Sequence, residues 1–242
     1  MEKIRLQKFF TDNNVMSRRS AEKVILAGNV KINGVCAKLG DKVDPENDIV
    51  EFNGKIIKNQ TTKKKYIMLN KPLGYVTTTS DEKGRDTVLS LVSDVGERVY
   101  PVGRLDMFSE GLLILTNDGE LTNRLTHPKN NMSKIYSVII KGEISPETLH
   151  KLNSPMEIDG YKLKPVQVRI ISMVNGNTNA MFTLTEGRNR QIRKMCEACS
   201  LTIMRLTRIA IGKLKLGELP RGKWRELTSG EVNYLSGKTS SL

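Results

Sequence analysis

The chain has 242 residues, a formal net charge of +13 and a composition that is 38% apolar but only 5% aromatic. This length and apolar content can supply the cores of one large and one small domain, and a sequence pI near 9.7 favours a polyanionic partner. Because aromatic residues are scarce, no broad surface for base stacking is expected, and folded RNA is a better candidate than an extended single strand.

Neither a membrane span nor a metal site is expected from the sequence. It contains no long apolar run and no acyl or prenyl motif, and the opening MEKIRLQKFF lacks the apolar core of a signal peptide, so we expect a cytoplasmic protein without a membrane partner. Cys196 and Cys199 form a CxxC pair, but only Cys36, His127 and His150 could complete a zinc site, and finger spacing is absent. We expect the pair to be small buried residues of a helix.

The first sixty residues show two helical patterns followed by short hairpins. The apolar spacing at Ile4–Phe10 predicts a short amphipathic helix, and Ser17 is a suitable N-cap for a second helix at 18–27. Runs of β-branched residues then flank the pairs Asn33–Gly34 and Asn53–Gly54, which are typical of type I′ hairpin turns.

The helical half of this segment is its more basic half, which favours an RNA-binding face there. A solvated helix surface explains any single charge equally well, so the concentration of charge is what favours RNA. The candidates for phosphate contacts, which position a protein without reading sequence, are Arg5, Lys8, Arg18, Arg19, Lys23 and Lys31. A polar stretch without periodicity at 57–65 indicates a linker, which divides the chain into domains at 1–60 and 61–242.

The larger segment combines strand and helix patterns that predict a mixed, mainly antiparallel sheet flanked by helices, and therefore an α+β fold. The expected strands are Tyr66–Asn70 (ended by Lys71 and Pro72), Tyr75–Thr79, Lys134–Lys141, Val166–Ser172 and Ala180–Thr185, with further strands in the alternating stretch 206–227. The expected helices are Glu120–Leu125, one that begins at Pro146 after the N-cap Ser145, and one that opens near Arg190, and Val88–Val92 is expected to be a short helix or a turn.

The stretch VGRLDMFSEGLLILTNDG, Val102–Gly119, places a carboxylate at the mouth of a core strand. Leu112–Leu115 is a short aliphatic run closed by a turn signal at 117–119, which is typical of a buried strand. Asp106 precedes this strand on a loop. Taken alone, Asp106 has an ordinary alternative role, because Asp often caps loops and turns.

Four stretches in a fixed order resemble the motifs of one enzyme family. Besides GRLD in the stretch just described, they are LNKPLGYVTT (Leu69–Thr78), SKIYSV (Ser133–Val138) and EGRNRQIRKM (Glu186–Met195). Together they resemble the pseudouridine synthases of ribosomal RNA, of the type that comprises synthase A for the small ribosomal subunit and synthase B for the large one. GELTNRLTHP (119–128) is most similar to the synthase B group. The segment SRRSAEKVILAGNVKING (17–34) resembles the S4 RNA-binding module.

This resemblance implies a site and a reaction. Asp106 matches the aspartate that the family uses as its nucleophile, Tyr136 its active-site tyrosine, and Arg193 the arginine that pairs with the aspartate. Arg104 resembles the residue that occupies the space left by a flipped base. The implied function is the isomerisation of a specific uridine in ribosomal RNA, 23S by similarity to the synthase B group, by a monomer without cofactor or metal. Attack of Asp106 on C1′ and removal of the C2′ proton both stay open.

Two further arginines are candidates for binding RNA, and two other functions compete with the proposed one. Arg188 and Arg190 belong to the most basic region and lie where a helix opens, so we expect them to bind phosphate, with a solvated helix face as the alternative. The competing functions are a noncatalytic S4-type RNA-binding or ribosome-assembly protein, and a synthase for 16S ribosomal RNA. Convergence of Asp106, Tyr136 and Arg193 in one cleft favours an enzyme.

Overall fold

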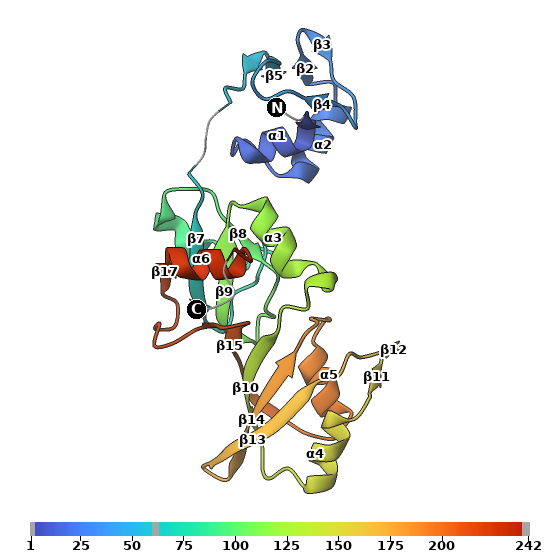
Figure 1. The fold of residues 1–242 in the computed structure, drawn as a ribbon, viewed down its shortest axis with the longest axis vertical. Coiled ribbons are helices and arrows are strands. Elements are labelled where there is room, and N and C mark those ends of the chain that lie inside the picture. The colour runs from blue at the N-terminus through green and yellow to red at the C-terminus, as the bar shows by residue number, and fades with distance from the viewer. Residues whose placement is uncertain (1–2, 60–62, 239–242) are drawn as a thin grey trace. The chain divides into compact units, whose positions relative to one another are not determined.

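The computed structural model describes residues 3–59 and 63–238. The chain forms two compact units, Met1–Lys64 and Lys65–Leu242, and Figure 1 colours them from blue to red along the chain. Residues 60–62, the centre of the expected linker, lie outside the described residues. Within the described ranges, no helix is long and apolar enough to cross a membrane.

The N-terminal unit packs two helices against short strands. Its elements are β1 (Ile4–Arg5), α1 (Leu6–Asp12), α2 (Arg18–Leu26), β2 (Val30–Ile32), β3 (Val35–Cys36), β4 (Lys42–Val43), β5 (Val50–Phe52) and β6 (Lys55–Ile56). Four of the strands form a sheet of order β3-β2-β5-β6, and β1 pairs separately with β4. Phe9 and Phe10 of α1 share a buried core with Ala21 and Ile25 of α2 and Val30 of β2.

Local sequence signals set most element ends in this unit. The Ser17 hydroxyl accepts a hydrogen bond from a backbone N–H of the first turn of α2, which confirms the predicted N-cap. All residues of Asn33–Gly34 and Asn53–Gly54 have positive φ, which confirms both type I′ turns. The predicted helix at Ile4–Phe10 is wrong at its start. It begins only at Leu6, because the two preceding residues pair with β4 as a strand.

The larger unit is built on one mixed sheet. Its strands are β7 (Tyr66–Lys71), β8 (Tyr100–Val102), β9 (Glu110–Thr116), β10 (Lys134–Ile140), β13 (Gln167–Val174), β14 (Asn177–Leu184), β15 (Ile203–Ile211), β16 (Leu214–Lys215) and β17 (Trp224–Glu226). The main order is β13-β14-β10-β15-β9-β7-β17, with β16 beside β15 and β8 beside β9. A separate hairpin joins β11 (Glu157–Ile158) to β12 (Tyr161–Lys162). In this sheet β9 and β15 run parallel and the other paired strands antiparallel, which confirms the predicted α+β class.

Helices cover this sheet in two groups. They are the 3-10 helices η1 (Ser90–Val95) and η2 (Pro128–Asn130), and α3 (Gly119–Thr126), α4 (Pro146–Asn153), α5 (Gln191–Glu197) and α6 (Ser229–Leu235). Leucines of α3 and α6 pack into one core with β7 and β9, whereas α4 and α5 pack on β10, β13 and β14 (Figure 1). Val88–Val92, expected as a short helix or a turn, begins as a turn and continues into η1 at Ser90.

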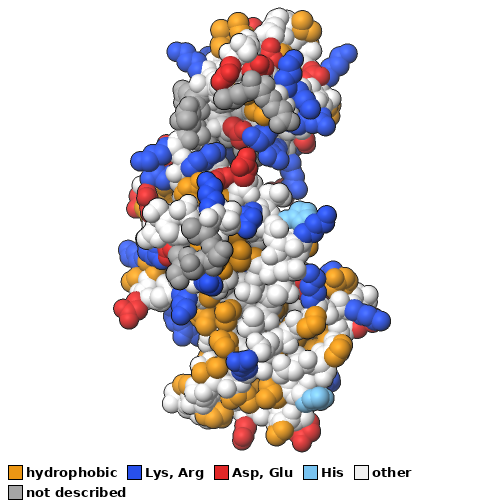
Figure 2. All heavy atoms as spheres, viewed as in Figure 1, with side chains coloured by type: hydrophobic (Ala, Val, Ile, Leu, Met, Phe, Trp, Pro, Cys, Tyr) orange, Lys and Arg blue, Asp and Glu red, His pale blue; other side chains and the backbone are white. Residues whose placement is uncertain are grey.

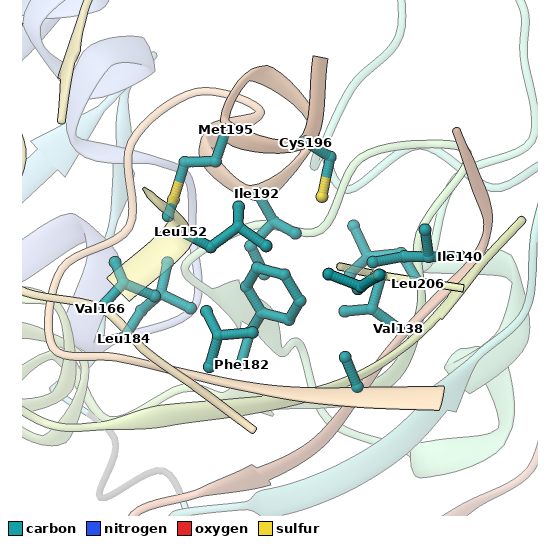
Figure 3. Close-up of a cluster of buried hydrophobic side chains, with 13 residues drawn as sticks. Val138, Ile140, Leu152, Val166, Phe182, Leu184, Ile192, Met195, Cys196 and Leu206 are labelled. Atoms are coloured by element: carbon teal, nitrogen blue, oxygen red, sulfur yellow. The ribbon is translucent and has the colours of Figure 1, made fainter. Parts of the chain in front are cut away.

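Figure 3 shows the core between α5 and the sheet. Phe182 of β14 lies among Ile192 and Met195 of α5 and Leu206 of β15, all of them buried. Cys196 belongs to the same core, as expected for a small buried residue, and burial raises the pKa of its thiol to about 12. Cys199 differs from the expectation, because it lies beyond the end of α5 and is only partly buried. In the described part of the chain, no group of three His, Cys, Asp or Glu residues is arranged to hold a metal ion.

Two expected features of the larger unit are wrong. Tyr75–Thr79 forms no strand, because Val76 makes only an isolated bridge and the hydroxyl of Thr77 donates to the Leu105 carbonyl instead of facing solvent. No tight turn closes β9 either. The Asp118 side chain accepts hydrogen bonds from the first backbone N–H groups of α3, so the chain passes directly from strand to helix.

Gly111 allows β9 to approach β15 closely. It pairs with Arg208 in parallel register, and its φ is +103°. A Cβ atom at this position would lie 2.3 Å from the Arg208 carbonyl oxygen. Both the backbone conformation and the contact therefore exclude a side chain.

Gly111→Ala should lower the free energy of unfolding of the larger unit by about 2–5 kcal/mol, because it adds backbone strain and a steric clash. The matched control is Gly142→Ala. Gly142 has φ of +77° but no atom within 4 Å of the added Cβ, so strain of about 1 kcal/mol is all that it adds. The fluorescence of Trp224, the one Trp of the chain, reports denaturant unfolding of this unit. Equal losses in the two variants would show that the approach to Arg208 is not a constraint.

Candidate active site

A cavity of about 300 Å³ opens beside Asp106 in the larger unit. Its lining comes from the loop 103–109 before β9, from β10, from the loop before α5 and from β15. Asp106 and Tyr136 both line it, so the fold brings together two of the three expected catalytic residues. Ile192 and Leu206, which Figure 3 labels in the adjacent core, form part of its apolar wall.

The loop 103–109, which carries Asp106, is attached to the neighbouring stretch 74–77 by its main chain. The Thr77 hydroxyl donates to the Leu105 carbonyl (2.8 Å), and the Gly74 N–H donates to the Met107 carbonyl (2.9 Å). These bonds lie on both sides of Asp106 in the chain. The LNKPLGYVTT motif therefore acts structurally, by fixing the backbone that presents the carboxylate.

Lys71 is a fully buried cation that is bonded to the same loop. Its ammonium donates to the carbonyls of Ser109 (2.8 Å) and Pro72 (2.9 Å). Burial lowers its pKa to about 8, against the opposing effect of the negative charges of Asp106 and Glu110. The sequence pattern predicts Lys71 only as the residue that ends a strand. Its position inside the LNKP motif is the one signal that could have indicated that it bonds the loop.

Arg193 of α5 also contacts the main chain of this loop. Its Nη2 donates to the Phe108 carbonyl (2.5 Å) and to the Ser109 hydroxyl (3.4 Å). Among the described residues it makes no hydrogen bond or ion pair with Asp106, so the direct pair that the resemblance implies is not formed. Burial and the charge of Arg190 lower its pKa, whereas the charge of Asp106 acts in the opposite direction. Arg193 is therefore within electrostatic reach of Asp106 but bonds the loop through its backbone.

Two cations flank Tyr136 on the sheet wall of the cavity. Tyr136 lies opposite Arg208 in the pairing of β10 with β15, and Lys134 lies two positions earlier on β10. All three line the cavity. Arg208 is only 4% exposed, and its Nε donates to the Leu112 carbonyl (2.7 Å). The alternation of basic and apolar residues around Arg208 predicts a strand but gives no sign that this arginine points inward.

Glu110, which begins β9, is buried with its charge satisfied. It forms an ion pair with Arg205, lies 3.4 Å from Arg221 Nε, and accepts a hydrogen bond from the Thr207 hydroxyl (2.9 Å). A buried carboxylate without such partners would be strongly destabilising. This cluster ties β15 to the end of the loop that carries Asp106.

The arginines expected to bind RNA near the site lie at the cavity. Arg104, Arg188 and Arg190 line it and are exposed. The Arg188 guanidinium lies 2.9 Å from the centre of the Tyr161 ring and 3.8 Å from Glu186. These side chains are accessible to a phosphate group without a change of fold.

The expected RNA-binding residues of the N-terminal unit lie at its surface. Lys8 is half-buried and forms an ion pair with Asp12 (2.6 Å), and Arg5 donates to the Gly40 carbonyl (2.8 Å). Arg18, Arg19, Lys23 and Lys31 are exposed. Figure 2 shows blue Lys and Arg side chains on the visible face of both units, so positive charge is not confined to one of them.

Comparison with known proteins decides the family. The family model described as RNA pseudouridylate synthase matches residues 65–198, and that of the S4 domain matches residues 4–50. The chain belongs to the RNA pseudouridylate synthase family. The synthase is therefore an enzyme that isomerises uridine in RNA to pseudouridine, and it carries an N-terminal S4 domain, as the sequence motifs predicted.

Named relatives cover nearly the whole synthase. It is 46% identical to an uncharacterized RNA pseudouridine synthase of Aquifex aeolicus, over 97% of this chain and 94% of the relative. It is 40% identical to ribosomal large subunit pseudouridine synthase B of Bacillus subtilis, over 96% and 95% of the two chains. A crystal structure of a pseudouridylate synthase has 30% identity and a TM-score of 0.68, and covers 96% of this chain and 99% of that one.

Lys71→Met should change how the stability of the synthase varies with pH. The pKa of Lys71 is about 8 in the folded protein, whereas the unfolded chain has the ordinary value of 10.5. Between these two pH values Lys71 is therefore mostly protonated in the unfolded chain and mostly deprotonated in the folded protein. The cost of burying the charge is therefore fully present below pH 8 and is relieved as the pH rises toward 10.5. The free energy of unfolding of the wild type relative to Lys71→Met should rise over this range by up to about 1 kcal/mol per pH unit.

Urea titrations that follow Trp224 fluorescence at several pH values measure this difference. Subtracting the Lys71→Met values cancels the titration of other groups, which both proteins share. A difference that does not vary with pH would show that Lys71 is not a desolvated cation in the folded protein.

Proposed function

We propose that the synthase converts a specific uridine of 23S ribosomal RNA to pseudouridine, with Asp106 as nucleophile or base. The observation that carries this proposal is the position of Asp106 on a fixed loop at a cavity that Tyr136 also lines. The Bacillus subtilis relative named for the large ribosomal subunit supports ribosomal RNA as the substrate. We further propose that the synthase acts as a monomer.

Asp106 would start the reaction at the ribose. The C1′–N1 bond must break, the uracil must turn, and C5 must be joined to C1′. An ionised Asp106 either attacks C1′ to form an ester or takes the C2′ proton to leave a C1′=C2′ double bond. Hydrogen bonds to the carbonyls of Leu105 and Ser109 hold the backbone that carries Asp106 before RNA binds, so less conformational entropy is lost when the site forms with RNA.

Tyr136 would act on the base. From β10 it lines the cavity, where its ring can stack on uracil and its hydroxyl can help to remove the C5 proton. A uridine in folded RNA must first leave its stack, at a cost of a few kcal/mol. Arg104 is exposed on the same loop as Asp106 and would occupy the space that the base vacates.

The exposed cations would supply affinity for RNA. Arg188 and Arg190 would bind phosphates beside the cavity, next to the flipped nucleotide. The catalytic domain would comprise 61–242 and the S4 domain 1–60. Within the S4 domain the phosphate-binding residues would be Arg5, Lys8, Arg18, Arg19, Lys23 and Lys31.

Mapping of pseudouridines in ribosomal RNA from cells with and without the synthase tests the substrate. Loss of one site in 23S RNA supports the proposal. Loss of a site in 16S RNA would reassign the enzyme to the small ribosomal subunit, and an unchanged map would overturn a ribosomal RNA substrate.

Asp106→Asn should abolish isomerisation and change RNA affinity only a few-fold, because the amide neither attacks nor takes a proton and no phosphate contact is lost. Tritium release from C5-labelled uridine in 23S transcripts measures turnover. Asp86→Asn, which changes an exposed carboxylate, is the matched control and should retain wild-type turnover. Substantial turnover of the Asp106 variant in a clean preparation would remove Asp106 from the mechanism.

Arg193→Met should slow turnover at saturating RNA by about tenfold or more, since the loop loses a charged donor and a nearby positive charge. Arg193→Lys should fall between wild type and Arg193→Met, because Lys keeps the charge but lacks the planar fork. Arg188→Met should instead raise the RNA concentration needed and flatten the salt dependence, with saturated turnover nearly intact. Single-turnover rates over a range of RNA concentrations separate these effects. A wild-type rate for Arg193→Met at saturation would place Arg193 among the phosphate-binding residues.

A further inference from the structure

Arg208 carries a buried charge whose donors are not all used within the described chain. Its side chain is 4% exposed, and its Nε donates to the Leu112 carbonyl. Its Nη2 is buried and has no hydrogen-bond partner among the described residues. A buried donor on a cation costs stability when it stays unpaired, so its retention at the cavity wall points to a ligand group that it receives there.

Lys134 brings a second positive charge to the same wall. It is half-buried, lines the cavity and donates to the Met132 carbonyl (3.0 Å). Burial and the nearby charge of Arg208 lower its pKa. Two cations that repel each other are thus placed beside Tyr136, where a negative charge between them would relieve the repulsion.

Because Arg208 is nearly buried, that negative charge is expected to come from the base and not from a phosphate. Exposed arginines already lie at the cavity for phosphates, namely Arg104, Arg188 and Arg190. A phosphate stays linked to both neighbouring nucleotides, so it remains near the surface of the protein. The flipped base alone extends inward, past the ribose, toward the nearly buried guanidinium of Arg208.

The chemistry of bond cleavage supplies a negative charge on the base. When C1′–N1 breaks, its electron pair leaves with the uracil, which becomes a monoanion with charge on N1, O2 and O4. At the ribose, C1′ gains either a bond to an Asp106 oxygen or a double bond to C2′, whose proton passes to Asp106. Later C5 bonds to C1′ as the bond from C1′ to the Asp106 oxygen breaks or, on the other route, as C2′ regains its proton from Asp106. C5 then loses its proton and N1 gains one, so no oxidant or reductant is required.

We propose that Arg208, assisted by Lys134, is a catalytic residue that stabilises the uracil anion formed when C1′–N1 breaks. This inference rests on the proposed function and adds to it the group that receives the departing base. Asp106 acts on the ribose from the loop, while Arg208 and Lys134 act on the base from strands β15 and β10. Preorganised donors directed at a developing negative charge, in a site shielded from water, are among the strongest contributions to catalysis.

The test compares two leaving groups in each variant. Fluorine at C5 withdraws electrons and stabilises the uracil anion without help from the protein. In vitro transcripts of 23S ribosomal RNA are made with uridine or with 5-fluorouridine, and single-turnover loss of the N1-linked target nucleoside is measured by chromatography and mass spectrometry after nuclease digestion. On 5-fluorouridine, C5 has no proton to lose, so the C5-linked product keeps its fluorine and takes up water across N1=C6. Loss of the N1-linked nucleoside therefore reports cleavage of C1′–N1 on both transcripts. The variants are Arg208→Gln, Arg208→Lys and Lys134→Gln, and the control is Arg169→Gln, which removes an exposed arginine from β13 of the same sheet.

At saturating enzyme, Arg208→Gln should react about a hundredfold more slowly than wild type on uridine transcripts, and the loss should be several-fold smaller on 5-fluorouridine transcripts. Lys134→Gln should show the same pattern with smaller losses, and Arg208→Lys should retain part of the rate because it keeps the charge. Arg169→Gln should match wild type on both transcripts.

Three results would overturn the inference. Equal losses on both transcripts would make Arg208 a structural residue that acts through its bond to Leu112. An intact saturated rate with a higher requirement for RNA would make it a phosphate-binding residue. If wild-type protein converted neither transcript, the proposed function itself would be wrong. The results for the variants alone cannot show this. The ratio between transcripts is measured within one variant, so partial loss of folded protein does not alter it.

Discussion

The attachment of the loop 103–109 is the constraint on which the site depends. Its carbonyl oxygens accept hydrogen bonds from the Thr77 hydroxyl, the Lys71 ammonium and the Arg193 guanidinium. These donors come from β7, from the stretch after it and from α5, so the loop is fixed only when distant parts of the chain have folded together. Loops are ordinarily the mobile parts of a domain, and these bonds restrain the backbone on both sides of Asp106.

A second constraint links this loop to the sheet. The parallel pairing of β9 with β15 depends on Gly111, since any Cβ there would meet the backbone of Arg208. The same pairing carries the buried cluster around Glu110 on one side and the cavity wall on the other. One close backbone contact therefore positions both β9, which follows the loop 103–109, and β15, which carries the buried guanidinium of Arg208.

Sequence reasoning succeeded where the determinant of structure is local. Ser17 predicts a helix start and Asn33–Gly34 a turn, because their partners lie within a few residues. It failed where the partner is distant in the chain. Ile4 fits a helix by spacing but pairs with β4, and Thr77 fits a strand but bonds to a loop that begins far beyond it.

The site follows the same division. Motif resemblance predicted Asp106 and Tyr136 at one cavity. The sequence pattern does not show that Arg193 bonds the Phe108 carbonyl or that Arg208 lines the cavity. Both depend on contacts between segments that lie far apart in the chain.

The hydrogen bonds that hold the loop 103–109 do not involve the side chain of Phe108. Gly74 and Arg193 bond the carbonyl oxygens of Met107 and Phe108, and every amino acid supplies such an oxygen. The Phe108 side chain is itself 60% exposed. Substitution at this position can alter the exposed surface of the loop while keeping the backbone hydrogen bonds on both sides of Asp106. The surface of the loop and the position of its carboxylate can consequently change independently of each other, although residues 106 and 108 are only two positions apart.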